Sequence, residues 1–322
     1  METFHILGID IAKVKFDVAL MVDDKFKSKV FTNTASGFCQ LGEWLKKHEV
    51  QRLHACMEAT NVYGNALANY LFEQGFTVSV VNPAQIKYFA KATLSRNKND
   101  KLDAQTIARF CQVMKPSEWS PAPSYLIELQ ALVQRLQSLI EMQTQEKNRL
   151  GTVEAVVKKS VDDSLKHLST QIETLREQIA QQIDTHPDLK QRAGLLESIP
   201  GVGDATIALV LSVIVDIHRF THQSHLVAFA GLNPKQKQSG SSVAGKATLS
   251  KVGHAGLRKA LYMPALVAMQ YNPVLKQFAE RLGCRHKSKM LIIGAVMRKL
   301  LVIIYGVLKS NKPFDPTLAL AK

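Results

Sequence analysis

The sequence lacks the features that mark exported proteins. The first residues, Met1-Glu2-Thr3, contain no cluster of basic residues followed by an apolar run, so they do not predict a secretory leader. The four cysteines lie far apart and have neither metal-ligand spacing nor the pattern of a disulfide framework. These absences predict a protein of the reducing cytoplasm.

An uninterrupted hydrophobic run of membrane-spanning length is also missing. The longest apolar stretch, residues 290–308, contains Arg298 and Lys299 in its middle. Two basic residues there predict a buried helix with a basic edge rather than a membrane span. The 322 residues, 46% of them hydrophobic, are enough for about two domains with substantial cores.

Acidic residues are nearly absent from the last third of the chain. Residues 231–322 contain 16 lysines and arginines but only Glu280 and Asp315, which accounts for the whole net charge of +14. Residues 1–230 are neutral, with 25 basic and 25 acidic side chains. This asymmetry predicts a polyanion partner for the last third, most simply nucleic acid. A charged surface that only aids solubility is the alternative.

Four carboxylates occupy positions that are not typical of solvent-exposed acidic residues. Asp10 and Glu58 each end an apolar run typical of a buried strand, and Asp100 and Asp103 lie three apart at the start of an expected helix. If the four converge, they repel one another unless a cation neutralises them. Oxygen ligands suit Mg²⁺ or Mn²⁺, so the pattern predicts a divalent metal site.

The order of expected elements fits such a convergence. Strands are expected at residues 4–10, 14–22, 25–32, 53–58 and 77–81, and helices at 36–47, 61–74 and from about 100 to 114. This βββαβαβ order followed by a helix predicts an α/β domain with a ribonuclease-H-like mixed sheet, which brings the ends of the first and fourth strands and a late helix together. The alternative makes Asp100 a helix N-cap and Asp103 a first-turn acid, but it leaves Asp10 and Glu58 unexplained.

Residues 121–186 are predicted to connect two domains, at 1–120 and 187–322. Pro121-Ala122-Pro123 is typical of a linker, and leucine and isoleucine then recur at intervals of three and four residues, with a break near Lys158–Asp163. This spacing predicts a helical hairpin or coiled coil. It would serve as a spacer or for self-association, or it would simply pack within the chain.

Pro200-Gly201-Val202-Gly203 stands between two apolar segments of helical period. The pattern predicts a helix-hairpin-helix motif in a mainly α C-terminal domain, with backbone N–H groups that meet a phosphate and do not distinguish base sequence. An ordinary turn between two helices is the alternative.

A serine-rich, basic loop follows at residues 231–250. The side chains that could contact a phosphate there are Lys235, Lys237, Ser239, Ser241, Ser242 and Lys246. The hydroxyls and N–H groups could bind phosphate, or one hydroxyl could attack phosphorus. Taken alone, such a loop is usually only a loop.

The combination of motifs resembles one family from about residue 4 to about residue 310. The motifs, in sequence order, are Gly8-Ile9-Asp10, Met57-Glu58-Ala59-Thr60, residues 97–104, Ile199-Pro200-Gly201-Val202-Gly203, Ala230-Gly231-Leu232-Asn233-Pro234 and Ser239-Gly240-Ser241-Ser242. They resemble the insertion-sequence transposases of the Asp-Glu-Asp-Asp type, relatives of the Piv-type DNA invertases. The resemblance implies a RuvC-like N-terminal domain joined by a coiled coil to a transposase domain.

The resemblance also implies roles and partners. The family's metal-binding acid tetrad corresponds to Asp10, Glu58, Asp100 and Asp103, and its serine corresponds to Ser239; the choice of Ser239 over Ser241 or Ser242 rests on the resemblance alone. Double-stranded donor and target DNA, a structured guide RNA and a homo-oligomer (a dimer, or a tetramer on DNA) are implied partners, in the bacterial cytoplasm at the nucleoid. The resulting hypothesis is a recombinase in which Ser239 forms a covalent phosphoserine link to DNA, assisted by Mg²⁺ that the four acids hold.

Two other hypotheses remain from the residues themselves. The acids alone could form a metal-dependent nuclease or junction resolvase with water as the nucleophile. The chain could also be a nucleic-acid-binding scaffold without activity, although the four acids would then be unexplained.

Overall fold

The computed structural model describes residues 4–23, 25–59, 61–93, 99–235, 238–239, 243–244 and 248–317. The chain divides into two compact units, Met1–Pro121 and Ala122–Lys322. Each unit has its own hydrophobic core.

The first unit is built on a five-stranded mixed sheet with the strand order β3-β2-β1-β4-β5. Its strands are β1 (Phe4–Ile11), β2 (Lys15–Val22), β3 (Lys25–Thr32), β4 (Arg52–Glu58) and β5 (Thr77–Val81). β1, β2 and β3 form an antiparallel meander, and β4 and β5 run parallel to β1. This is the arrangement that the strand order predicted, with β3 at one edge.

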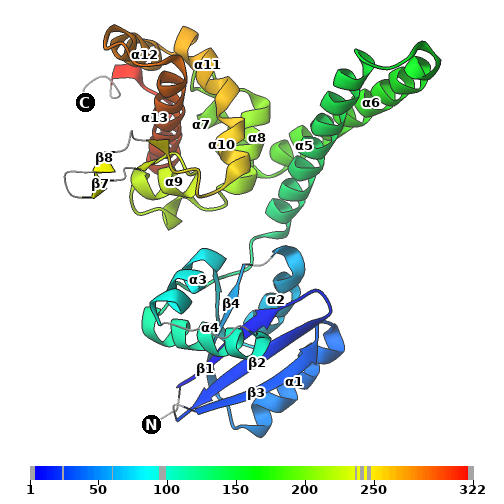
Figure 1. Ribbon diagram of the computed structural model, residues 1–322, viewed down its shortest axis with the longest axis vertical. Helices are drawn as coiled ribbons and strands as arrows, with labels where there is room; N and C mark the ends of the chain where they lie inside the picture. Colours follow the sequence, from blue (N-terminus) through cyan, green and yellow to red (C-terminus); the bar gives the residue numbers. More distant parts are fainter. Residues whose placement is uncertain are drawn as a thin grey trace. The chain divides into compact units, whose positions relative to one another are not determined.

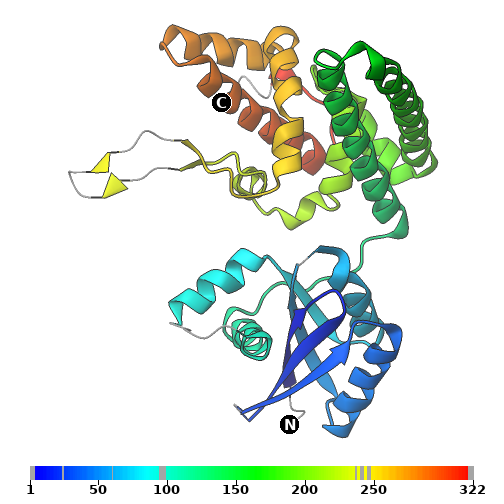
Figure 2. The same cartoon turned by 45° about the vertical axis from the view of Figure 1, so that its right-hand side comes forward.

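Helices cover both faces of this sheet (Figures 1 and 2). They are α1 (Ala35–Lys47), α2 (Asn65–Glu73), α3 (Pro83–Ala92) and α4 (Asp100–Met114). α1 and α2 bury Leu41 and Leu67 against one face, whereas α3 and α4 bury Ile86 and Ile107 against the other. The helix expected at 61–74 is interrupted, because residues Asn61–Gly64 form a 3₁₀ turn before α2.

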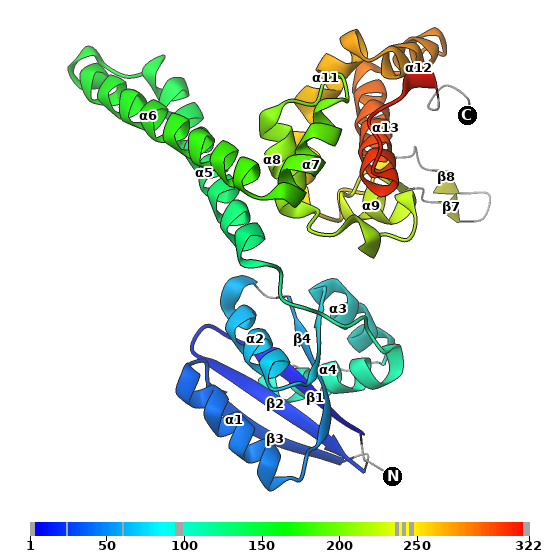
Figure 3. The ribbon, with the colours of Figure 1, turned by 180° about the vertical axis from the view of Figure 1, so that it is seen from behind.

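The second unit begins with a long helical hairpin made of α5 (Ser124–Leu150) and α6 (Ala155–Thr185), which Figure 3 shows from behind. α5 and α6 pack against each other, and Leu129 and Leu139 of the predicted seam are buried. The break is not near Lys158–Asp163 as expected. It falls at residues 151–154, where Gly151 lowers helix propensity, and α6 continues through the polar residues that follow.

The remaining helices form an all-α bundle. They are α7 (Pro187–Glu197), α8 (Asp204–Val213), α9 (Gln223–Phe229), α10 (Ala255–Ala260), α11 (Tyr262–Tyr271), α12 (Pro273–Cys284) and α13 (Lys289–Ser310), with a 3₁₀ turn at Ile217–Arg219. α13 packs against α7, α9, α11 and α12.

α13 is the single helix of the described residues that is long and apolar enough to cross a membrane by length and composition. However, 56% of its most apolar window is buried within the unit, and Arg298 lies exposed on its outer side. It therefore has the form predicted for residues 290–308, a buried core helix with a basic edge.

Four two-residue strands lie between α9 and α10. β6 (Pro234–Lys235) pairs with β9 (Thr248–Leu249), and β7 (Gln238–Ser239) pairs with β8 (Val243–Ala244). Both pairs are antiparallel, so the serine-bearing segment has the backbone form of a narrow hairpin at these positions.

Candidate functional site

Two of the four candidate acids stand at the ends of neighbouring parallel strands. The register pairs Ile9 of β1 with Met57 of β4, and Asp10 and Glu58 follow this pair directly. Alternation along a strand puts their side chains on the same face of the sheet, away from the buried Ile9. Both residues are partly exposed. The sheet therefore sets Asp10 and Glu58 side by side, as the sequence predicted.

α4 brings the other two acids to this face. Its N-cap is Asn99, whose side-chain oxygen accepts a hydrogen bond from the Leu102 N–H at 2.8 Å. The alternative that made Asp100 the N-cap is therefore wrong, because Asn99 satisfies that N–H and leaves Asp100 and Asp103 in the first turn. Negative charge there is favoured by the helix dipole, so this placement is locally stable.

Gly8 allows α4 to approach the sheet closely. A Cβ atom at this position would lie 2.0 Å from the Ala104 carbonyl oxygen and 2.4 Å from the Ala108 nitrogen. Both are backbone atoms, so no side-chain movement could make room. The contact holds α4 close to β1 at a position two residues before Asp10.

Several acids act on the ionisation of Asp10. Burial and the neighbouring carboxylates of Asp103, Asp100 and Asp17, in that order of effect, together raise the pKa of Asp10 from 3.8 to about 6. The Lys15 ammonium acts in the opposite direction. Asp10, Asp100 and Asp103 thus share one electrostatic neighbourhood, with Glu58 on the adjacent strand.

Asp17 and Lys15 belong to this neighbourhood and were not predicted from the sequence. Asp17 is buried and lies directly opposite Asp10 in the β1–β2 register. Lys15 Nζ lies 3.2 Å from Asp17 Oδ2 and 2.8 Å from Asp100 Oδ2, so it bridges strand and helix. The signal was available: Asp10 and Asp17 are both polar positions in strands joined by a short turn.

The donor set fits a divalent cation in its chemistry. Carboxylate oxygens are the preferred ligands of Mg²⁺ and Mn²⁺, and repulsion among the acids near Asp10 gives a cation a favourable field. Within the part of the chain that the structure describes, however, no three His, Cys, Asp or Glu side chains are placed to hold one ion. The Lys15 ammonium already pairs with Asp100, so metal binding at Asp100 requires a side-chain rearrangement.

The turn between α7 and α8 has the backbone geometry of a tight helical hairpin. Gly201 has a φ of +97°, and a Cβ atom there would lie 2.8 Å from the Ala268 nitrogen of α11. Packing against α11 is therefore enough to require a glycine at position 201. Gly203 is the N-cap of α8 and has open space around it, so it does leave the helix N-terminus accessible.

One feature of this turn opposes an anion. Asp204 is exposed in the first turn of α8 and places a carboxylate beside the N–H groups that would meet a phosphate. The candidate phosphate site at Gly201 and Gly203 thus has a negative charge beside it, which would repel a phosphate.

The serine segment is only partly described. Lys235 is exposed in β6, and the backbone of Ser239 pairs with Val243 in β7 and β8. The predicted Lys237, Ser241, Ser242 and Lys246 lie outside the described residues. Ser239 belongs to the second unit and the acids to the first.

Comparison with known families identifies a class of DNA-recombining enzymes. Residues 7–153 match the family of DEDD transposases of IS110 elements, described as transposase, and residues 193–280 match the family described as transposase IS116/IS110/IS902. A pilin gene-inverting protein of Moraxella lacunata is 37% identical over 312 residues, which are 96% of this chain and 97% of the relative. The corresponding protein of Moraxella bovis is also 37% identical.

The chain belongs to the IS110-type family of transposases and DNA invertases, as the motif set predicted, and is a DNA recombinase. A more distant relative, the transposase for insertion sequence element IS1111A of Coxiella burnetii, is 24% identical and is matched over 84% of this chain and 79% of its own length. Among solved structures, Thermus thermophilus RuvC bound to a Holliday junction substrate aligns with 36% of this chain and 99% of its own, at 15% identity and a TM-score of 0.28.

Proposed function

We propose that this protein is a site-specific recombinase of a mobile element that cuts and rejoins DNA through a covalent link to Ser239. The observation that supports it most is the gathering of Asp10, Asp100 and Asp103 on one sheet face, in a chain of a DNA-recombining family. Acids at this strand end suit phosphoryl transfer, whose demand is positioning and charge stabilisation.

In the proposed cutting step, Ser239 Oγ forms a bond to the phosphorus of a DNA phosphodiester while one bond from phosphorus to a sugar oxygen breaks. The serine hydroxyl loses its proton, and the released sugar oxygen gains one. A DNA hydroxyl reverses these changes when it attacks the phosphoserine link, which restores the serine. The phosphodiester bond energy is conserved in the link, so rejoining needs no ATP.

Asp10, Glu58, Asp100 and Asp103 would hold Mg²⁺ or Mn²⁺. When bound, the cation supplies Lewis-acid stabilisation of the charge on the phosphate oxygens. Asp17 and Lys15 position the acids: Lys15 ties Asp100 to β2 through its two ion pairs and spreads positive charge among the carboxylates.

The second unit would bind nucleic acid and assemble the complex. The turn at Gly201 and Gly203 acts as a helix-hairpin-helix contact to the DNA backbone, and Lys235, together with Lys237, Ser241, Ser242 and Lys246, contacts phosphates near the cut. The α5–α6 hairpin serves as a coiled coil that pairs protomers, giving a dimer and a tetramer on donor and target DNA. A structured RNA guides target choice, and the protein works in the bacterial cytoplasm at the nucleoid.

The test is a search for a covalent protein–DNA adduct. The protein is mixed with Mg²⁺ and end-labelled DNA carrying its element boundary, and the products are run on a denaturing gel. We expect an adduct that disappears in Ser239→Ala and Asp10→Asn and persists in the matched controls Ser241→Ala and Ser242→Ala. An adduct that survives Ser239→Ala would overturn the assignment of the nucleophile.

A second candidate is a metal-dependent nuclease or junction resolvase that uses water. It is favoured by the placement of all four acids within the first unit, whereas the serine segment belongs to the second unit. The products distinguish the two functions. Free nicked ends without any protein-linked DNA, unaffected by Ser239→Ala, would favour the nuclease.

A further inference from the structure

The free edge of the five-stranded sheet carries a row of lysines that the balanced charge of residues 1–230 conceals. Lys25, Lys27 and Lys29 alternate along β3, so they share one face and stand about 7 Å apart. Lys47 lies beside them in the last turn of α1, and all four lysines are exposed. These four lysines are called the β3–α1 patch below.

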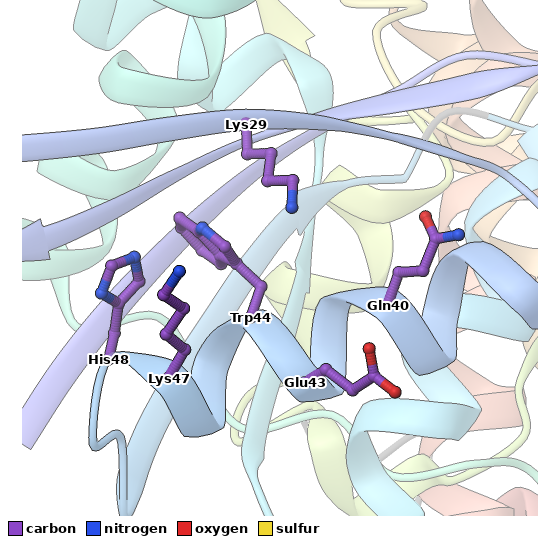
Figure 4. Close-up of a pocket in the computed structure, with 6 residues that line it drawn as sticks. All are labelled: Lys29, Gln40, Glu43, Trp44, Lys47 and His48. Atoms are coloured by element: carbon purple, nitrogen blue, oxygen red, sulfur yellow. The ribbon is translucent and has the colours of Figure 1, made fainter.

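A hollow separates the strand from the helix at this patch. It has a volume of about 430 Å³ and is lined by Lys29, Gln40, Glu43, Trp44, Lys47 and His48. In Figure 4, Lys29 reaches down from β3 and Lys47 reaches up from α1 toward the space between the two elements. Glu43 is the one acid in this lining, so the hollow is predominantly basic.

The charge of the patch is not compensated within the described residues. Its lysines form no ion pair there, and Lys27 Nζ lies 3.3 Å from His48 Nδ1. Burial and the nearby Lys27, Lys47 and Lys29 lower the pKa of His48. His48 is therefore neutral at pH 7 and accepts a hydrogen bond from Lys27, which orients that lysine without cancelling its charge.

The aromatic residues beside the patch already contact other side chains of the protein. The Trp44 ring meets Phe31 edge-on at 6.0 Å and His48 at 4.8 Å between centroids, and Phe31 carries Lys29 over its face at 5.0 Å. Because binding of single strands uses free aromatic faces for base stacking, this arrangement favours contact with phosphates only. Flexible lysines in a row suit the backbone of a duplex without base recognition.

We propose that the β3–α1 patch binds the sugar–phosphate backbone of double-stranded DNA, at a segment separate from the one that is cut. The separation follows from the sheet: Lys27 and Lys29 pair with Leu20 and Val18 on the face that α1 covers, whereas Asp10 lies on the face that α4 covers. The inference rests on DNA being the substrate of the proposed function.

The test compares Lys27→Gln/Lys29→Gln with the matched pair Lys158→Gln/Lys159→Gln, which removes the same charge from exposed positions of α6. All chains carry Asp10→Asn, so binding is measured without cutting. Affinity for a duplex of unrelated sequence and for an RNA hairpin of equal length is measured by fluorescence anisotropy at several salt concentrations. We expect the β3 variant to bind duplex DNA about tenfold more weakly at 0.1 M salt, with a shallower salt dependence.

Lys27→Arg/Lys29→Arg keeps the charge and is expected to restore affinity. Unchanged DNA binding together with aggregation of the Gln variant would overturn the proposal, since the lysines would then only protect a sheet edge from pairing. A loss confined to the RNA hairpin would overturn the choice of DNA. The same lysine variants are also made with Asp10 unchanged and tested for the covalent adduct. If the protein without lysine substitutions forms no adduct, the proposed function fails, whatever the lysine variants do to DNA affinity.

Discussion

Asp10 is a residue on which burial and like charge act together. A carboxyl whose pKa rises from 3.8 to about 6 on folding binds its proton more tightly in the folded state, so its ionisation opposes folding. The loss of stability caused by ionised Asp10 is nearly absent below pH 4, grows between pH 4 and 6, and reaches its full size above about pH 6.

Asp10→Asn should therefore stabilise the metal-free protein. We expect the free energy of unfolding of the first unit to rise by at most roughly 3 kcal/mol at pH 7.5, and by about 1 kcal/mol at pH 4.5. Urea unfolding in EDTA at the two pH values measures the difference. Asp23→Asn, an exposed acid in a turn, is the control and should change little.

Addition of Mg²⁺ should act in the opposite sense. The unchanged protein should gain stability from the cation, and Asp10→Asn should gain less, because one proposed ligand is lost. Equal stabilisation of both proteins would speak against a metal at this strand end.

Asp17 and Lys15 show why single residues of the site were missed. The alternation of Val14, Phe16, Val18 and Leu20 indicates one buried face of the second strand and leaves Asp17 on the face expected to be polar. Phe16, Val18 and Leu20 are indeed buried, whereas Val14 precedes β2 and is exposed. α4 covers that face, so Asp17 is buried and opposes Asp10. Periodicity identifies a face but not the helix that later covers it.

Among the elements, those of the first unit were largely predictable because each strand has a strong local pattern. The bounds of β3 and β5 agree with expectation, and those of β1, β2 and β4 differ by one residue. The long hairpin was predicted from its spacing, but its turn was misplaced, because Gly151 is a weaker indication than the polar run that follows.

The N-terminus of α8 offers a prediction about the turn that precedes it. If phosphates bind at Gly203, Asp204→Asn removes a repulsive charge, and DNA affinity should rise about two- to fivefold. The same change should lower stability by a few tenths of a kcal/mol, because the helix dipole loses a favourable acid. Binding titrations and thermal melts measure the two effects.

Asp188→Asn is the matched control for that experiment, since Asp188 occupies the first turn of α7. It should lower stability without raising DNA affinity. A rise for both variants would indicate a general charge effect rather than a phosphate site at the turn.

Over the whole molecule, the two cores should respond separately to mutation. Leu41 is fully buried in the first unit and Leu300 in the second. Each Leu→Ala change should cost about 2–5 kcal/mol in its own unit. Both tryptophans, Trp44 and Trp119, lie in the first unit, so fluorescence reports on that unit, whereas far-ultraviolet circular dichroism is dominated by the helical second unit.

Leu300→Ala should thus shift the unfolding curve seen by circular dichroism and leave the fluorescence curve in place, and Leu41→Ala should shift the fluorescence curve. Coincident shifts by both probes for either variant would indicate that the units unfold as one.

The charge pattern along the whole chain located the basic last third but concealed the β3–α1 patch, because acids elsewhere in residues 1–230 balance its lysines.

The contact between Gly8 and the backbone of α4 has a mechanical consequence. Asp10 and Glu58 are attached to the sheet, Asp100 and Asp103 to the helix, and backbone touches backbone where the two bodies meet. The contact prevents α4 from moving closer to the sheet, and Asp100 and Asp103 share one turn of the helix. A rotation of α4 about its axis would therefore change the distances of both helix acids from Asp10 and Glu58 at the same time.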